Sequence, residues 1–435
     1  MAFKLRGIKI PHRKNTDNTV PNRISEIKSV TLPTSMHIGA PANVTVKKGD
    51  KVFVGSLVAE QNGVISSPVY SSVSGTVTAL SDVLLSNGRT CLGVTVESDG
   101  EMKLDENIKP PVVKNGEDLI NALKLSGIVG LGGAGFPTFA KFGTEKPLQI
   151  EILAINGAEC EPYITSDSVT MVQRNEDIAF ALNMLTTHFN IKEVVIGIEK
   201  NKPNAIKAMQ SISLDNADLA VKVLPCSYPQ GAEKVLIYNT TGRVVPMGKL
   251  PIDVGCVVCN SSTVAEIGKY LKTGIPLVER CITVDGSAVK NPQNVIAPIG
   301  ASISDVFEFC GGFKEEPKKV LYGGPMMGIA VPTTDMPVLK NTNALLAFAE
   351  NDAKLPKTTH CIKCGSCANN CPFGINPVEI AIARQNKDYA ALEKAGTMLC
   401  MECGCCSFVC PAKIPIVQNN KLAKDALRNQ PKEKK

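Results

Sequence analysis

The sequence has little of what marks a membrane-spanning, secreted or nucleic-acid-binding chain. Across 435 residues, no uninterrupted apolar run approaches the roughly 18–20 residues that span a bilayer. The basic residues of Met1–Lys14 have no apolar segment behind them, so no secretory signal is expected. The formal net charge is only +6, and Lys and Arg are spread among Asp and Glu, which argues against nucleic acid as a partner. We therefore expect a cytoplasmic protein without a membrane anchor.

What is present describes a globular chain of several domains. The length alone predicts about three domains. Apolar residues make up 44% and charged residues 20%, with 35 Gly and 28 Pro, a composition typical of a loop-rich globular protein. Only Lys421–Lys435 is clearly basic. We expect a solvated, frayed tail there, with a docking patch as the alternative.

Cysteine carries the strongest signal. Sixteen cysteines in a secreted chain would suggest disulfides, but eight of these occupy the motif positions of two compact runs, and such spacing indicates metal. Both runs follow the pattern C-x2-C-x2-C-x3-C-P of proteins with two [4Fe–4S] clusters. Structural zinc sites usually present two C-x2-C pairs with a long spacer, which does not fit. The runs place Cys361, Cys364, Cys367 and Cys371 before Pro372, and Cys400, Cys403, Cys406 and Cys410 before Pro411.

The pattern also assigns the ligands. Three closely spaced thiolates hold one cluster, while the fourth, before the proline, reaches the neighbouring cluster. Cys405 is expected to be a spectator, and His360 to be solvated or hydrogen-bonded. A helix is expected between the runs, from Pro377 towards Gly396, and this spacer is similar to the helical ferredoxin domain of the succinate dehydrogenase iron–sulfur subunit. The predicted ligands are Cys361, Cys364, Cys367 and Cys410 for cluster 1, and Cys400, Cys403, Cys406 and Cys371 for cluster 2.

The centre of the chain is rich in glycine. A helix predicted over 116–126 leads into Gly127–Gly135, where the density of glycine lets backbone N–H groups approach a phosphate. Such a run alone could be only a turn. However, 150–155 reads as a buried strand that delivers 156–163 to a strand end, where ligands of α/β sheets bind. Further short strands are predicted over 194–198 and 221–224, as in a Rossmann-like parallel sheet.

At this point the sequence resembles the flavin-binding, NADH-oxidising subunit of respiratory complex I. The motif G-R-G-G-A-G-F-P-T-G-x-K of that family stands here from Gly130 to Lys141, with Leu131 in place of Arg. Its N-A-D-E-x-E-P-G stands at 156–163, with Ala158 in place of Asp. Its Tyr and G-E-E-T segment stands at 228–234, with Ala232 in place of the first Glu, and its N-N-V-E-T segment stands at 259–263.

The resemblance implies a set of site residues. Glu159, Glu161 and Glu233 would position the nicotinamide or its ribose, the catalytic role. An inherited fold that has lost its flavin is the alternative. The residues implied to bind FMN or NAD(H) are Gly130, Gly132, Gly133, Gly135, Phe136, Lys141, Asn156, Glu159, Tyr228, Glu233, Asn260 and Thr263.

Two further modules flank this centre. Short β-rich runs from Ile38 to Val96, with a hairpin predicted at Gly49-Asp50, resemble a lipoyl-like barrel-sandwich module. Because no Lys lies between Lys51 and Lys103, we expect it to be structural. Residues 280–312 resemble the β-grasp (SLBB) module that follows the flavin domain in complex I. The predicted fold class is multidomain α/β plus β, with boundaries at 1–105, 106–275, 276–340 and 341–435 for the barrel-sandwich, flavin, β-grasp and ferredoxin modules.

This module order resembles the RnfC/RsxC family, which belongs to the Rnf ion-translocating ferredoxin–NAD oxidoreductase complexes. The resemblance implies non-covalent FMN, two [4Fe–4S] clusters and NAD(H) as substrate. It also implies a peripheral subunit on the cytoplasmic face of the membrane. The expected partners are other subunits, one of them an Fe–S subunit, and ferredoxin indirectly. The alternatives are a cobalamin reductase and a non-catalytic electron conduit.

Overall fold

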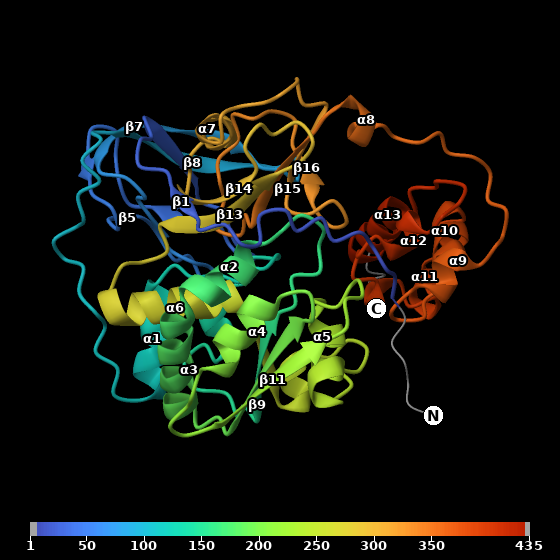
Figure 1. The fold of residues 1–435 in the computed structure, drawn as a ribbon, viewed down its shortest axis with the longest axis horizontal. Coiled ribbons are helices and arrows are strands. Elements are labelled where there is room, and N and C mark those ends of the chain that lie inside the picture. The colour runs from blue at the N-terminus through green and yellow to red at the C-terminus, as the bar shows by residue number, and fades with distance from the viewer. Residues whose placement is uncertain (1–6, 431–435) are drawn as a thin grey trace.

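The protein was studied as a computed structural model that describes residues 7–430. Within this range three β-containing bodies pack together, and a small helical body stands to one side (Figure 1). In the described range, no helix combines the length and the apolar character needed to cross a bilayer.

The N-terminal body is a sandwich of two small sheets. One sheet has the order β2 (Ser29–Pro33), β8 (Thr90–Ser98), β7 (Gly75–Leu84), β4 (Lys51–Val52), and the other has the order β3 (Asn43–Val44), β5 (Leu57–Glu60), β6 (Val69–Tyr70). Along β7 and β8, alternate residues such as Val77, Val94 and Val96 are buried, the period expected of strands with one face on a core.

The hairpin predicted at Gly49-Asp50 is wrong. A turn is present, closed by a hydrogen bond from the Asp50 amide to the Lys47 carbonyl at 3.1 Å. However, β3 before the turn pairs with β5, and β4 after it pairs with β7. The turn therefore carries the chain from one sheet to the other, an arrangement that local turn signals do not distinguish from a hairpin.

The flavin domain is a four-stranded parallel sheet with the order β11-β10-β9-β12. The strands are β11 (Asp218–Leu224), β10 (Glu193–Glu199), β9 (Ile152–Gly157) and β12 (Cys256–Asn260). The three strands predicted from the sequence are confirmed, and β9 and β10 are buried along nearly their whole length, as parallel strands covered on both faces are. The order reverses between β9 and β12, and such a switch point is where α/β sheets bind ligands.

Helices surround this sheet (Figure 1). They are α1 (Gly116–Leu125), α2 (Ser166–Gln173), α3 (Asn175–Phe189), α4 (Pro203–Gln210), α5 (Glu233–Thr241) and α6 (Ser261–Thr273). The predicted helix over 116–126 is confirmed as α1, which begins with Asn115 as its N-cap and buries Leu119, Ile120 and Leu123. An N-cap side chain of this kind satisfies one of the amide groups that a helix start leaves unpaired.

The β-grasp body extends beyond its predicted range. Its sheet has the order β1 (Asn22–Arg23), β14 (Gln293–Pro298), β13 (Glu279–Asp285), β17 (Ala344–Phe348), β15 (Lys319–Tyr322), β16 (Ile329–Ala330), with α7 (Ile303–Phe309) beside it. Strand β17 follows residue 340, where the module was predicted to end. All five residues of β17 are buried, so this segment is part of the β-grasp core.

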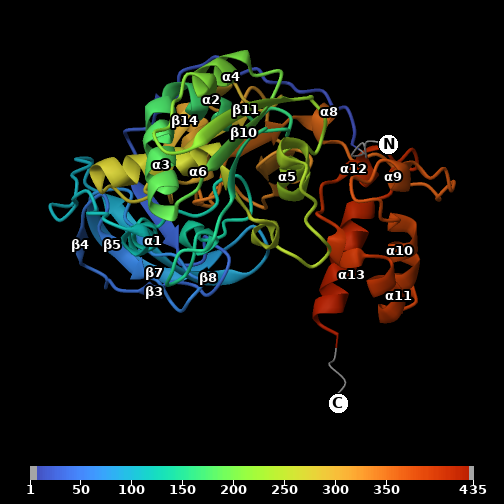
Figure 2. The same ribbon diagram turned by 90° about the horizontal axis from the view of Figure 1, so that it is seen from below.

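The ferredoxin domain is helical and stands apart from the other bodies (Figure 2). Its elements are α9 (Ser366–Asn369), α10 (Pro377–Gln385), α11 (Tyr389–Lys394), α12 (Cys405–Phe408) and α13 (Ile416–Arg428). The single helix predicted between the cysteine runs is two helices. They are separated at Lys387, whose φ of 55° lies in the left-handed region, which ends a right-handed helix.

The frayed tail predicted from Lys421 is also wrong for most of its length. Helix α13 continues to Arg428, and Lys424 on it is buried. The Lys424 ammonium donates to the Cys400 carbonyl at 2.8 Å and to the Glu402 carboxylate at 2.5 Å. Basic residues that the sequence suggested were solvated therefore hold α13 against the second cysteine run. Residues 431–435 lie outside the described residues.

Candidate functional site

The glycine loop lies at the switch point of the parallel sheet. Asn156 at the end of β9 and Asn260 at the end of β12 are register partners, so both predicted binding residues sit at the same edge. The Leu131 amide donates to the Thr263 hydroxyl at 3.0 Å. A Cβ on Gly132 would lie 2.8 Å from the Asn260 amide nitrogen, so the loop passes Asn260 as closely as glycine allows.

The tip of this loop is open. The Gly130 amide donates to the Phe136 carbonyl at 2.8 Å, which closes the loop at its base. Gly132 and Gly133 are exposed, and a Cβ on Gly133 would meet nothing within 4 Å. At Gly135 the φ is +69°, a conformation that glycine adopts without strain. An open glycine backbone at a strand end fits a phosphate-bearing cofactor such as FMN.

Asp167 anchors Asn260 beneath the loop. Its carboxylate accepts hydrogen bonds from the Asn260 amide at 2.6 Å and from the Ser262 hydroxyl at 2.5 Å. Asn260 is also the N-cap of α6, where its side-chain oxygen accepts the Thr263 amide at 3.2 Å. Sequence reasoning missed Asp167, which lies in the first turn of α2. An acid at a helix start was the signal that could have found it.

Glu159 caps a helix. Its carboxylate accepts the amides of Asp167 at 2.7 Å and of Ser168 at 3.3 Å, at the start of α2. Burial raises the pKa of Glu159 to about 8, the Lys14 charge opposes this, and Asp167 adds to it. Its backbone has a φ of 45°, which turns the chain sharply after β9.

The N-terminal segment contacts the loop that carries Glu159, and the sequence did not predict this contact. The ammonium of Lys14 donates to the carbonyls of Glu159 at 2.8 Å, of Glu161 at 2.9 Å and of Ile164. Burial lowers the pKa of Lys14, against the raising effect of Glu159. The segment also pairs Ile8 with Tyr228 through two backbone hydrogen bonds of 2.9 Å. Lys14 thus fixes the loop that carries both predicted glutamates.

Glu161 connects the flavin domain to the β-grasp body, and Tyr228 connects it to the ferredoxin domain. The Glu161 carboxylate accepts the amides of Met326 at 3.0 Å and Met327 at 2.8 Å. The Tyr228 hydroxyl donates to the Cys403 carbonyl at 2.8 Å and lies 3.4 Å from Glu161. The direct nucleotide contacts expected of Glu159, Glu161 and Tyr228 stay predictions. In this structure their polar groups bond to protein partners, because neighbouring loops pack onto the strand ends.

Glu233 and Lys141 both lie near Cys259 on β12. Glu233 is exposed and is the first residue of α5. The Lys141 ammonium donates to the Val258 carbonyl at 2.7 Å. Burial raises the pKa of Cys259 to about 11, while Lys141 acts to lower this pKa and Glu233 acts to raise it.

The side-chain amide of Asn156 donates a hydrogen bond to the Gly231 carbonyl at 2.7 Å. This bond holds the 228–234 loop against β9.

The second cysteine run and Cys371 surround one pocket. Its lining includes all four predicted ligands of cluster 2, together with Cys405 and apolar residues such as Phe373 and Ile375. Cys371 lies close enough to Cys400 and Cys403 for their charges to interact. The structure thus brings Cys371 to the other run, as the crossed pattern requires. Four thiolates around an apolar pocket fit a [4Fe–4S] cluster.

The ligands predicted for cluster 1 differ in exposure. Cys367 and Cys410 are buried and belong to one apolar cluster. Cys361 and Cys364 are exposed, as is His360 beside them. The Thr359 amide donates to the Ala412 carbonyl at 3.0 Å, which lays the segment before Cys361 alongside Cys410. Among the described residues, no group of three or more Cys, His, Asp or Glu is arranged for a single ion.

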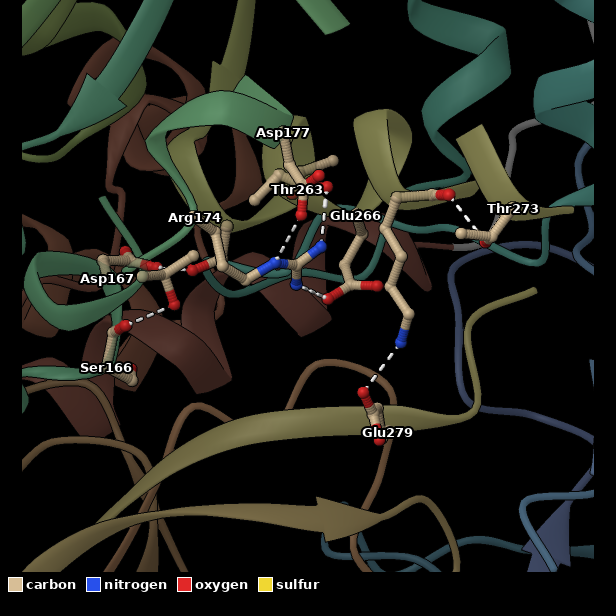
Figure 3. A network of polar contacts seen from close by, with 12 residues as sticks. Ser166, Asp167, Arg174, Asp177, Thr263, Glu266, Thr273 and Glu279 are labelled. Carbon is tan, nitrogen blue, oxygen red and sulfur yellow. Dashed lines mark hydrogen bonds and ion pairs between the residues drawn. The ribbon is translucent and has the colours of Figure 1, made fainter. Parts of the chain in front are cut away.

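A network of ion pairs joins the flavin domain to the β-grasp sheet (Figure 3). Arg174, at the junction of α2 and α3, bonds to Asp177 at 3.0 Å and to Glu266 on α6. Lys269 on α6 reaches Glu279 on β13 at 2.7 Å. The network lines a pocket of about 420 Å³. Each of these charges has a partner, so the network holds the flavin domain against the β-grasp sheet.

Comparison with known families assigns each part of the chain. A model described as the Nuo51 FMN-binding domain matches residues 123–269, and one described as the RnfC barrel sandwich hybrid domain matches 2–101. An SLBB domain matches 281–330, and a 4Fe-4S dicluster domain matches 357–414. Each match falls inside the range predicted for its module, and the predicted fold class is confirmed.

Relatives that match most of the chain are also found, and three of them are C subunits of ion-translocating oxidoreductase complexes. The chain is 42% identical over 96% of its length to that of the Na(+)-translocating ferredoxin:NAD(+) oxidoreductase complex of Acetobacterium woodii, of which it covers 95%. It is 38% identical over 85% of its length to the proton-translocating counterpart of Clostridium ljungdahlii, of which it covers 81%. It is 36% identical over 98% of its length to that of the ion-translocating oxidoreductase complex of Rhodobacter capsulatus, of which it covers 83%.

Among solved structures, the fold is similar to a chain of an NAD+-reducing [NiFe]-hydrogenase. The TM-score is 0.53 at 18% identity, covering 74% of this chain and 63% of that one.

Proposed function

The chain belongs to the RnfC family, the C subunits of ion-translocating ferredoxin:NAD(+) oxidoreductase complexes, and we propose that it is the subunit of such a complex that reacts with NAD(H). The observation that carries this proposal is the union, in one chain, of an FMN-binding domain and a dicluster domain that touch through Tyr228 and Cys403. The relatives favour this function over a cobalamin reductase.

The chemistry explains why the two domains occur together. A nicotinamide gives up two electrons as a hydride, whereas an Fe–S cluster takes one at a time. When bound, FMN exchanges electrons in both modes. The chain supplies orientation: the open backbone of Gly130–Gly135 for a phosphate, and the fixed loops of Glu159 and Glu161 as the wall beside it.

We assign different roles to the three predicted glutamates. Glu159 and Glu161 position the strand-end loops, because their carboxylates bond to backbone amides. Glu233 is exposed at the start of α5, so it is the carboxylate free to contact a nucleotide. Lys141 also lies near Cys259 and is assigned to charge neutralisation of the FMN phosphate.

The relatives support a place in a multi-subunit complex, and the proposal extends to its partners. The chain acts as a peripheral subunit on the cytoplasmic face of a membrane complex. It exchanges electrons with another subunit that carries an Fe–S cluster, and with ferredoxin indirectly.

The test is Glu233→Gln in the full-length, cofactor-loaded protein. NADH-dependent reduction of an artificial acceptor should slow by about tenfold or more, because loss of about 1.4 kcal/mol of transition-state positioning has that effect. Reduction of the clusters by dithionite, which bypasses the nucleotide, should be unchanged. The matched control is Glu176→Gln, since Glu176 is an exposed Glu in the first turn of α3.

Two outcomes would count against these assignments. NADH kinetics equal to wild type in Glu233→Gln would remove Glu233 from the nucleotide site. Purified protein that shows broad cluster absorption but releases no FMN and is not reduced by NADH would favour the non-catalytic electron conduit.

A further inference from the structure

The two cluster sites are placed asymmetrically in the molecule. All four predicted ligands of cluster 2 are buried, and Cys403 packs in an apolar cluster with Tyr228, Ile8 and Ile10. Two ligands of cluster 1, Cys361 and Cys364, are exposed. Cluster 2 therefore faces the flavin domain, and cluster 1 reaches the surface of the ferredoxin domain, away from it.

The surface around cluster 1 has an apolar centre. Ile362, between the two exposed ligands, is 66% exposed, and Leu355 on the approaching segment is 83% exposed. We call the surface made by residues 354–364 and 411–414 the cluster 1 edge. Its two segments lie side by side, because Thr358 and Thr359 bond to the backbone of Lys413 and Ala412.

The rim of the cluster 1 edge is basic. Lys354, Lys357, Lys363 and Lys413 are all exposed on it. The sequence has no Asp or Glu from Ala353 to Val378 or from Cys403 to Lys424. Elsewhere Lys and Arg are mixed with acids, so this concentration of one sign is local. Apolar residues at the centre and charges at the rim are the anatomy of a protein interface.

We propose that the cluster 1 edge is the docking surface for a protein partner that surrounds its own one-electron centre with acidic residues. Basic groups around an exposed redox site steer an acidic partner into contact and fix its orientation. Ile362 is the apolar anchor at the centre, and the lysines supply the charge. This inference rests on the proposed function, since it names where electrons pass between this chain and its neighbour.

An anionic lipid surface would also attract basic and apolar side chains. The exposed cysteines favour a protein. Lipid covering Cys361 and Cys364 would insulate the cluster at the point where it is most accessible, whereas a protein can bring a redox centre there.

The first experiment measures the local charge with small redox probes. Cluster-loaded protein is reduced with dithionite and mixed with ferricyanide, an anion, or with hexaammineruthenium(III), a cation. Ferricyanide should oxidise the wild type fastest at low ionic strength, and its rate should fall by about fivefold or more between 0.01 and 0.3 M salt as screening shortens from about 30 Å to below 10 Å. Changing Lys357, Lys363 and Lys413 together to Glu should reverse the preference.

The matched control carries the same change in net charge elsewhere. Lys192, Lys207 and Lys222 are exposed lysines of the flavin domain, and their replacement together by Glu should leave the ferricyanide rate within about twofold of wild type. Equal effects of the two triple variants would overturn the proposal, because they would show a response to net charge alone.

The second experiment identifies the class of occupant in the intact complex. A carbodiimide joins amines to carboxylates in direct contact, so it should cross-link Lys357, Lys363 or Lys413 to acidic residues of another subunit. Cross-links confined to other exposed lysines would overturn the proposal. So would binding of the free chain to phosphatidylglycerol vesicles that is lost in the triple variant while no cross-link to another subunit forms. A chain that fails here but still reduces its clusters with NADH keeps the proposed function.

Discussion

Asp167 is the residue on which the geometry beneath the glycine loop depends. It is 6% exposed, and both carboxylate oxygens accept short hydrogen bonds, from Asn260 and from Ser262. Because a hydrogen bond to a charged group is worth about 1.5–3 kcal/mol, Asp167→Asn should weaken FMN binding by about 1–3 kcal/mol. Flavin fluorescence under dilution measures this, with iron content as the check that the clusters persist.

The control for this change is Asp215→Asn, which alters an exposed Asp of the same domain. It should bind FMN like the wild type. If Asp167→Asn also bound FMN like the wild type, the Asp167 to Asn260 contact would have no part in forming the site.

His37 makes the protein sensitive to mild acid. Its ring Nε2 lies 3.1 Å from the Ser67 amide nitrogen and 3.0 Å from the Ala40 carbonyl oxygen, inside the barrel-sandwich body. Burial, followed by the charge of Lys340, lowers the pKa of His37 from 6.5 to about 4. As pH falls below 6.5 the unfolded chain takes up a proton that the folded chain does not, so the free energy of unfolding should fall by about 2–3 kcal/mol between pH 6.5 and 4.

His37→Gln should remove that part of the pH dependence, because Gln has no proton to gain. Urea unfolding at pH 7 and at pH 4.5 measures it. His360→Gln, at an exposed position, should keep the wild-type slope. An unchanged slope in His37→Gln would assign the acid sensitivity to other groups.

At this scale the cysteine spacing indicated which side chains come together, whereas the nucleotide contacts stay predictions. The cysteine spacing is itself a geometric constraint, so Cys371 could be placed with the second run in advance. For Glu161 and Tyr228 the motif placed the residues at the correct strand ends. It did not reveal that Met326 and Cys403, distant in sequence, occupy their polar groups.

At the scale of the helices and strands, the crossed ligand assignment of the two cysteine runs can be tested directly. Cys371 follows α9 in the first run but lies in the cluster 2 pocket. Cys371→Ala should therefore damage cluster 2 and leave cluster 1, lowering iron from about eight to about four per chain. Iron analysis and EPR of the reduced protein measure this.

Cys405→Ala is the matched control, because Cys405 is a buried cysteine of the same pocket that the pattern leaves without a ligand role. It should retain both clusters. Loss of cluster 1 alone in Cys371→Ala would contradict the crossed assignment.

Helices and strands could be predicted where the sequence pattern that indicates them lies within the element itself. Strands β9 and β10 are continuous apolar runs, and α1 has an N-cap and an apolar face. The wrong predictions concern strands whose pairing partners lie far away in the sequence. The turn at Gly49-Asp50 has the right residues, but its strands pair elsewhere. Strand β17 belongs to the β-grasp core because β13 and β15 lie beside it, and no pattern within 344–348 indicates which sheet it joins.

At the scale of the whole molecule, Tyr228 connects the flavin domain to the cluster 2 loop. Tyr228→Phe removes the hydrogen bond to the Cys403 carbonyl, worth about 0.5–1.5 kcal/mol, and should loosen that contact. We expect slower reduction of the clusters by NADH in stopped-flow absorption, with flavin-level reduction of an artificial acceptor unchanged.

Tyr322→Phe is the control, since Tyr322 is a buried tyrosine whose hydroxyl donates to the Pro337 carbonyl within the β-grasp body. It should leave both rates unchanged. If both variants slowed cluster reduction equally, the effect would come from general loosening and not from the contact between domains.

The contacts of the N-terminal segment bear on the order in which parts of the chain fold during synthesis. Ile8 and Ile10 are synthesised long before Cys403 and Cys405, yet they pack against them. Domains generally fold as units during synthesis, the N-terminal ones first. The apolar side chains of this segment therefore stay partly uncovered until the second cysteine run has been made.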